Sequence, residues 1–367
     1  MNNLNPSFFD HNMEIVPESS FKSIIKVIGI GGGGSNAVRH MDKLHIKGAD
    51  LIICNTDSQA LASNTVKTKI KLGNQGLGAG TDPEVGRQAA IESKEELSKV
   101  LTDETEMVFI TAGMGGGTGT GAAPVIAQLA REKGLLTVGI VTAPYKWEGK
   151  EKINYALKGI EELKTYCDTV LVVMNDKLAE HYENLPMSDA FSKADDVLAK
   201  AVKSVVDVIA KPGDINTDFM DVKKVLTNAG QAMMSSALGK GEERAKAAIV
   251  EALNSPLLNS QEIKGAKRIL VTVSTSSEKD LLIWEKDAII EYLNERIDAQ
   301  ADMVKFGFST DEELGDDLYL TVIAAGFEQD SSGMDGGMRK VVKKAAPVFL
   351  NPGDSVELDG ELETAAP

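Results

Sequence analysis

The chain has 367 residues, of which 43% are hydrophobic, and it carries a formal net charge of −16. This length predicts two domains with tails, because domains average about 150 residues. The acidic balance excludes broad nucleic-acid binding, which requires a basic face, and no apolar run reaches the roughly eighteen residues that cross a bilayer, so no membrane span is expected.

Residues 1–23 show no periodic pattern and are predicted to be a disordered extension. They lack the basic region of a signal peptide, so we expect a cytoplasmic protein. Between residues 24 and 187, short apolar runs alternate with helical patterns, which is typical of a parallel sheet covered on both faces. The predicted strands cover residues 24–30, 51–54, 107–112, 135–142 and 170–174. This part is therefore predicted to be an α/β domain.

The cysteines and histidines predict neither a disulfide nor a metal site. Cys54 and Cys167 each lie inside an apolar run and are predicted to be buried, reduced thiols. His40 and His45 are five residues apart, a spacing that does not share a helix face well, so no metal ligand is assigned to them.

A long helix is predicted over residues 188–210, where apolar residues recur at helical spacing until Lys211-Pro212-Gly213 ends the pattern. Because its apolar positions spread around much of the circumference, we expect it to be buried between two domains. A loop to residue 217 follows, and a second helix is predicted from Asp218 through Met233-Met234.

The pattern over residues 218–328 predicts a smaller α+β domain. Its further predicted elements are a strand at 268–274, a helix at 283–296, and strands at 301–309 and 318–327. Residues 329–367 are rich in Gly, Ser, Asp and Pro, and are predicted to be a disordered tail.

Three glycine-rich segments lie in the first domain. Residues 115–121, Gly-Gly-Gly-Thr-Gly-Thr-Gly, stand between a predicted strand and an alanine-rich helix that begins at Ala122. Glycines let successive backbone N–H groups converge, and a helix N-terminus adds partial positive charge, so this segment predicts a phosphate-binding loop. A flexible linker is the alternative, although linkers more often have longer serine-rich tracts. The other two segments are residues 29–36, which open a helix at Ala37, and residues 76–81.

Residues 29–36 alone satisfy the dinucleotide-binding fingerprint, with Asp57 as a possible ribose reader. An NAD-dependent Rossmann-type oxidoreductase is therefore one hypothesis. It uses one glycine loop and leaves two unexplained, whereas three loops at one sheet edge predict a phosphate chain held from several sides. The chain has no G-x-x-x-x-G-K-[ST] motif, so backbone amides must do most of the phosphate binding.

Taken together, these motifs resemble the tubulin/FtsZ superfamily, and the bacterial FtsZ family within it more than tubulin. They span residues 24–327 in the family's order: 31–36, 55–57, 76–80 with Pro83-Glu84, 115–121, and Asn216-x-Asp218-x-x-Asp221. The resemblance implies an α/β fold in which a parallel-sheet GTP-binding domain is joined by a long central helix (188–217 with its loop) to the smaller α+β domain. It also implies GTP/GDP as the nucleotide, with Mg²⁺ held mostly by phosphate oxygens and water.

The resemblance assigns roles to individual positions. Phosphate binding falls to Gly32, Gly33, Asn36, Gly115, Gly116, Gly117, Thr118, Gly119, Thr120 and Gly121, and Ala79, Gly80 and Thr81 lie near the γ-phosphate. Glu148 would contact the ribose. Asn175 and Asp195 would read the guanine edge, on which a carboxylate accepts from both N1–H and N2–H, and Phe191 would stack on the ring.

Several of these assignments have plainer alternatives when only the residues are considered. Asn175 is then more simply a turn cap after a strand, and Asp195 a solvated helix residue, with Asp196 next to it as a competing base reader. The family commonly has an arginine four positions after the ribose-contacting glutamate, where this chain has Lys152. A lysine keeps the charge and loses the planar fork, so our hypothesis is that Lys152 contacts the phosphates as a point charge, with Lys150 as the alternative.

Asp218 and Asp221 are three residues apart at the start of a predicted helix, so their carboxylates share a face. From the residues alone, an N-cap with a first-turn acid is the simpler interpretation. The resemblance implies instead that Asn216, Asp218 and Asp221 of one subunit complete the GTP site of the next, so that head-to-tail assembly into filaments switches on hydrolysis. A non-hydrolysing relative is the alternative, and the presence of both aspartates argues against it.

The resemblance also implies a biological setting. It predicts a protein of the bacterial division ring, located in the cytoplasm at midcell, whose partners are other copies of itself, division-ring proteins and membrane-anchoring adaptors. Residues 347–350, Pro-Val-Phe-Leu, match only part of the docking peptide expected of the family, so the sequence leaves open whether that peptide is divergent or missing.

Overall fold

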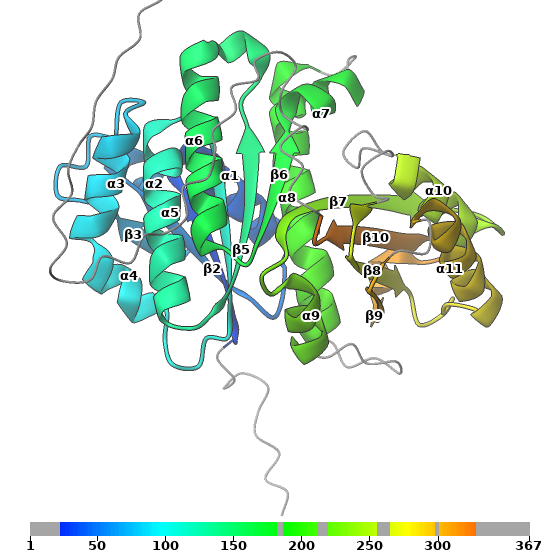
Figure 1. Ribbon diagram of the computed structural model, residues 1–367. Helices are drawn as coiled ribbons and strands as arrows, with labels where there is room; N and C mark the ends of the chain where they lie inside the picture. The colour runs from blue at the N-terminus through cyan, green and yellow to red at the C-terminus, as the bar shows by residue number, and fades with distance from the viewer. Residues whose placement is uncertain (1–22, 182–185, 211–218, 255–264, 298–300, 328–367) are drawn as a thin grey trace, which may run out of the picture. The chain divides into compact units, whose positions relative to one another are not determined.

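The computed structural model describes residues 23–181, 186–210, 219–254, 265–297 and 301–327 (Figure 1). Its strands are β1 Ile25–Ile30, β2 Asp50–Asn55, β3 Thr68–Lys71, β4 Met107–Gly113, β5 Leu136–Ala143, β6 Thr169–Met174, β7 Gly230–Gly239, β8 Arg268–Thr275, β9 Met303–Thr310 and β10 Leu318–Ala325. The described strands form one ten-stranded sheet in the order β3-β2-β1-β4-β5-β6-β7-β10-β8-β9.

Helices separate consecutive strands along the chain as far as β9, and only a short 3-10 turn separates β9 from β10. The helices are α1 Gly31–Lys43, α2 Ser58–Ala62, α3 Pro83–Glu92, α4 Lys94–Val100, α5 Gly117–Glu132, α6 Lys150–Tyr166, α7 Asn175–His181, α8 Met187–Ala210, α9 Phe219–Leu226, α10 Arg244–Asn254 and α11 Ile283–Ile297. Short 3-10 turns occur at Lys146–Glu148 and Glu312–Leu314. Within the described ranges, no helix is both long and apolar enough to cross a bilayer.

The first six strands are all parallel to their neighbours, which confirms the predicted α/β pattern. β1 is buried along its whole length, as expected for a parallel strand that helices cover on both faces. One face packs against α3, α4, α5 and α6, and the other against α1, α8 and α9. The sequence analysis missed β3, because only Ile70 of its four residues is buried and the rest are exposed.

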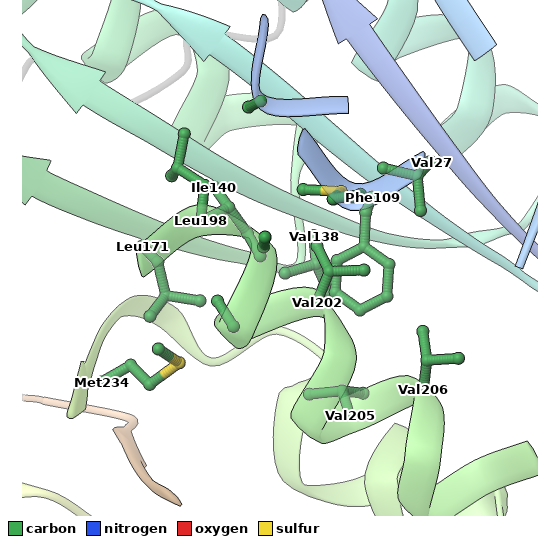
Figure 2. Packing of buried hydrophobic residues seen from close by; sticks show 14 of the residues in the cluster. Val27, Phe109, Val138, Ile140, Leu171, Leu198, Val202, Val205, Val206 and Met234 are labelled. Atoms are coloured by element: carbon green, nitrogen blue, oxygen red, sulfur yellow. The ribbon is translucent and has the colours of Figure 1, made fainter. Parts of the chain in front are cut away.

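The long predicted helix is α8, and its apolar side chains form the centre of one core cluster (Figure 2). Leu198, Val202 and Val206 are at most 2% exposed and lie against the parallel strands, where Phe109 contributes the largest side chain of the cluster. The same cluster includes Met234 of β7. The helix therefore packs against both the parallel strands and the sheet region that follows it in the chain.

One predicted element is wrong. The helix expected to run through Met233-Met234 ends at Leu226, and both methionines belong to β7. Asn228 and Gly230 have φ values of +49° and +69°, a left-handed conformation that no α-helix can continue through. Met234 then faces the α8 cluster, whereas Met233 packs on the opposite side with α10 and α11.

The second half of the sheet is mixed. β10 pairs antiparallel with both β7 and β8, while β8 and β9 are parallel, and β9 forms the edge. Helices α10 and α11 cover one face. Cys54 and Cys167 are free and buried, as predicted, and burial raises the pKa of both thiols well above its usual value.

Candidate nucleotide-binding site

Helices α1 and α5 begin where the neighbouring strands β1 and β4 end. Neither helix has a side-chain cap, and neither has an acidic residue in its first turn. The first N–H groups of a helix have no partner inside it, so both ends offer donors and partial positive charge to an anion. The helices start at Gly31 and Gly117 instead of the predicted Ala37 and Ala122, because glycines form their first turns.

The three glycine segments converge, as predicted. A Cβ on Gly117 would lie 2.8 Å from the carbonyl oxygen of Asp82, and a Cβ on Gly31 would lie 3.0 Å from the backbone nitrogen of Gly119. Real Cβ atoms essentially never come as close as the distance at Gly117, and Gly31 has φ +70°, a conformation that favours glycine, so both positions favour glycine where the segments pack together. The hydroxyls of Thr56 and Thr118, 2.7 Å apart, add a hydrogen bond between β2's end and α5.

Other glycines in the same segments face open space. A Cβ on Gly32, Gly80 or Gly116 would meet no atom of the described chain within 4 Å, apart from the glycine's own chain neighbours and helix backbone. Gly32 and Gly116 stand at the uncapped starts of α1 and α5, so a ligand can approach the backbone N–H groups there. Thr81 follows Gly80 with φ +73°, a conformation that is strained for a β-branched residue. Such strain is concentrated at functional sites in other proteins.

Asn175 begins α7 directly after β6 and is 7% exposed. Among the described residues its side-chain oxygen Oδ1 has no hydrogen-bond partner. A capping asparagine would use that oxygen on an N–H of the first helical turn, so the turn-cap interpretation does not account for it. Because an unpaired buried acceptor is unfavourable, this oxygen is available to a ligand donor.

Asp195 and Asp196 of α8 have different surroundings. The Asp196 carboxylate lies 3.4 Å from Nε2 of His40 and 3.0 Å from Nζ of Lys200. Within the described chain, Asp195 has no hydrogen bond or ion pair, and burial raises its pKa to about 6 although the nearby charges of His40 and Arg39 lower it. Asp195 is therefore the carboxylate that remains available as an acceptor.

The turn that contains Glu148 is fixed by hydrogen bonds. Glu148 accepts from the backbone N–H of Tyr145 at 2.9 Å and from Nζ of Lys152 at 3.0 Å. Asp176 accepts from the backbone N–H of Lys146 at 3.2 Å, which connects this turn to the start of α7. A Cβ on Gly115 would lie 2.9 Å from the Lys152 carbonyl oxygen, so α6 packs closely on the glycine loop.

The remaining predicted residues are only partly placed. Asn216 and Asp218 lie outside the described residues, and so does the side chain of Phe191 in α8. Asp221 lies in α9, where its Oδ1 is 2.6 Å from Nζ of Lys305 on β9. Thr120 accepts a hydrogen bond from the N–H of Gly115 at 2.8 Å, so its hydroxyl stabilises the loop itself.

Two residues are assigned differently once the structure is known. Asp57 caps α2, accepting from the backbone N–H groups of Gln59 at 2.8 Å and Ala60 at 3.1 Å, so its carboxylate is not the ribose reader of a dinucleotide site. Arg39, which the sequence analysis missed, donates to Oδ1 of Asn36 at 3.1 Å and also acts on Asp195. The sequence signal for this contact was the three-residue spacing of Asn36 and Arg39, which places both side chains on one face of a helix.

Comparisons with known proteins show the family of the chain. Residues 24–183 match the family model "Tubulin/FtsZ family, GTPase domain", and residues 230–328 match "FtsZ family, C-terminal domain". The chain is 46% identical over 319 residues to a cell division protein FtsZ of Porphyromonas gingivalis, covering 86% of this chain and 69% of that protein. It is 44% identical over 317 residues to the Pseudomonas aeruginosa protein of the same name, covering 85% and 79%.

Solved structures of FtsZ and of a related protein are similar to this chain in fold. The fold is similar to that of an empty FtsZ dimer from M. jannaschii, with a TM-score of 0.78 at 40% identity over 84% of this chain and 89% of that one. A protofilament of CetZ2 from Haloferax volcanii shares the fold alone, with a TM-score of 0.72 at 21% identity over 83% and 93%. The Rossmann oxidoreductase alternative is not favoured, and the chain belongs to the FtsZ family of tubulin-like GTPases.

Proposed function

We propose that this protein binds GTP, hydrolyses it to GDP and phosphate, and assembles head to tail into filaments. The observation that carries the proposal is the pair of uncapped helix starts, α1 and α5, beside glycines that face open space. A triphosphate would supply the anionic oxygens that these N–H groups lack. The phosphates would be bound by Gly32, Gly33, Asn36 and residues 115–121, with Ala79, Gly80 and Thr81 nearest the γ-phosphate.

Guanine is the base that suits the other end of the site. Its edge offers the N1–H and N2–H donors, which an unpaired Asp195 carboxylate would accept, and the unpaired Asn175 oxygen would accept from a further nucleotide donor. Adenine has no such pair of donors. Glu148 would contact the ribose, Phe191 would stack on the ring, and Lys152 would add positive charge beside the phosphates.

Mg²⁺ would neutralise part of the triphosphate charge. Among the described residues no group of three or more His, Cys, Asp or Glu side chains could hold a metal. As the counter-ion of a triphosphate, Mg²⁺ would be held mostly by phosphate oxygens and water, and we name no protein ligand.

Hydrolysis would be completed between subunits. Asn216, Asp218 and Asp221 of one subunit would orient the water that attacks the γ-phosphorus of its neighbour's GTP. The P–O bond to the β,γ-bridging oxygen breaks, a bond to the water oxygen forms, and the water proton passes to phosphate. Phosphoryl transfer depends mainly on positioning and electrostatic stabilisation, so groups that arrive with a neighbouring subunit can switch it on.

In the cell, we propose that the filaments form the bacterial division ring in the cytoplasm at midcell. Division-ring proteins and membrane-anchoring adaptors would be the partners. Support comes from membership of the FtsZ family and from the relatives' name, cell division protein.

Replacing Asp218 with alanine tests the proposal. The variant should bind GTP and assemble as the unmodified protein does, with hydrolysis per assembled subunit about 100-fold slower. Nucleotide affinity, light scattering and phosphate release in one sample separate the three properties. Normal phosphate release by Asp218→Ala would contradict hydrolysis completed by the neighbour.

A further inference from the structure

An ion pair joins the edge strand β9 to helix α9. Nζ of Lys305 lies 2.6 Å from Oδ1 of Asp221. Lys305 pairs in the sheet with Leu270 of β8, and its side chain shares a face with Met303, which packs against the α8 cluster. Phe306 lies on the opposite face. The lysine is thus directed toward the face of the sheet that α9 covers.

A lysine on an edge strand has a plain explanation, because edge charges discourage pairing with other strands. That role needs only a solvated ammonium. Here the side chains of Lys305 and Asp221 are 35% and 29% exposed, so both are partly removed from water. Ion pairs of this kind are screened less than fully exposed ones. The contact is therefore more specific than edge protection requires.

We propose that Lys305 is a positioning residue for GTP hydrolysis in the adjacent subunit, an inference that rests on the proposed role of Asp221. The ammonium restricts the Asp221 carboxylate to one orientation through Oδ1. It also places a positive charge beside a carboxylate that must approach a triphosphate, which reduces the repulsion between like charges. The motif that contains Asp221 gives no sign of this lysine, since the two residues meet only through the fold.

The test compares three single variants of the full chain. Lys305→Met removes the charge and Lys305→Arg keeps it. Lys240→Met is the control for loss of a lysine charge, because Lys240 is more exposed and forms a 3.2 Å ion pair with Asp317, away from Asp221. GTP affinity of the unassembled protein, assembly with a slowly hydrolysed GTP analogue, and phosphate release per assembled subunit are measured for each. The first two measurements establish that the variants fold and associate.

Lys305→Met should slow phosphate release per assembled subunit about three- to tenfold, with affinity and assembly unchanged. Lys305→Arg should recover most of the rate, and Lys240→Met should match the unmodified protein. A normal rate in Lys305→Met overturns the inference. Equal losses in Lys305→Met and Lys305→Arg overturn it as well, since packing and not charge would then matter.

Asp221→Asn separates this inference from the proposed function. If Asp221→Asn is slow and Lys305→Met is normal, the role of Lys305 fails alone. If Asp221→Asn hydrolyses GTP normally, the role proposed for Asp221 fails, and the inference fails with it. Where both are slow, the double variant should be no slower than Asp221→Asn, because Lys305 acts through that carboxylate.

Discussion

Four of the helices that begin next to the glycine segments fall into two pairs. Helices α2 and α3 carry their own anions: Asp57 and Asp82 accept hydrogen bonds from backbone N–H groups of the first turns. Helices α1 and α5 have no such cap. The first N–H groups of every helix need an acceptor. In α2 and α3 a side chain accepts from them, whereas in α1 and α5 no side chain does. The difference indicates which helix starts serve the fold and which serve a ligand.

Giving α5 an anion of its own should have the largest effect. Gly116 has φ −89°, which any residue adopts, and its Cα faces open space, so Gly116→Asp can cap the helix without strain. A carboxylate there would compete with the phosphates, and GTP affinity should fall at least about 100-fold. Isothermal titration measures it. The neutral control Gly116→Asn should lose less GTP affinity than Gly116→Asp. If Gly116→Asp binds GTP as tightly as the unmodified protein, the comparison between capped and uncapped helices is contradicted.

At the base end, the contrast is between Asp195 and Asp196. Asp195→Asn should weaken GTP binding about 10- to 100-fold, because charge-assisted hydrogen bonds to guanine are lost. Asp196 is already paired with His40 and Lys200, so Asp196→Asn should have a much smaller effect. Competition binding with GTP and ATP measures both. A larger loss in Asp196→Asn would assign the base-reading role to Asp196.

The raised pKa of Asp195 predicts a pH dependence. Burial raises this pKa from 3.8 to about 6 in the free protein, so the carboxylate is charged above pH 6 and protonated below it. A protonated group loses an acceptor, so GTP affinity should be level above pH 7 and fall by up to about tenfold per unit below pH 6. Titrations from pH 5 to 8 measure this, and Asp195→Asn is the control. The same decline in that variant would assign the effect to another group.

The smallest effect is expected at the capped helices. Asp57→Ala removes the two hydrogen bonds at the start of α2 and should lower the free energy of unfolding by about 1 kcal/mol. Urea unfolding without nucleotide measures the change. GTP affinity should stay within about twofold, since this carboxylate serves the fold. A large loss of GTP affinity in Asp57→Ala would indicate that Asp57 belongs to the nucleotide site.

Five strands of the parallel sheet, β1, β2, β4, β5 and β6, and helix α8 could be predicted because each is a continuous apolar pattern that depends on local sequence, whereas the mostly exposed β3 has no such pattern. The same reasoning failed at Met233-Met234, where two residues in left-handed conformation ended a helix that the apolar run seemed to extend. Glycines hid the starts of α1 and α5, since a glycine-rich first turn has no periodic pattern.

For the site, the glycine segments were readable because their composition is itself the signal. Contacts between distant segments could not be predicted from the sequence. The unpaired oxygen of Asn175, the pairing that separates Asp196 from Asp195, and the Lys305–Asp221 ion pair all depend on which elements the fold brings together.

The central claim is that hydrolysis is completed at the contact between subunits. It is tested most directly by measuring phosphate release against protein concentration while light scattering is recorded in the same cuvette. Our account predicts a rate per molecule near zero up to a threshold concentration, and a rise together with scattering above it. A rate per molecule that is the same at every concentration would contradict the account, because it would describe a GTPase that is complete in a single subunit.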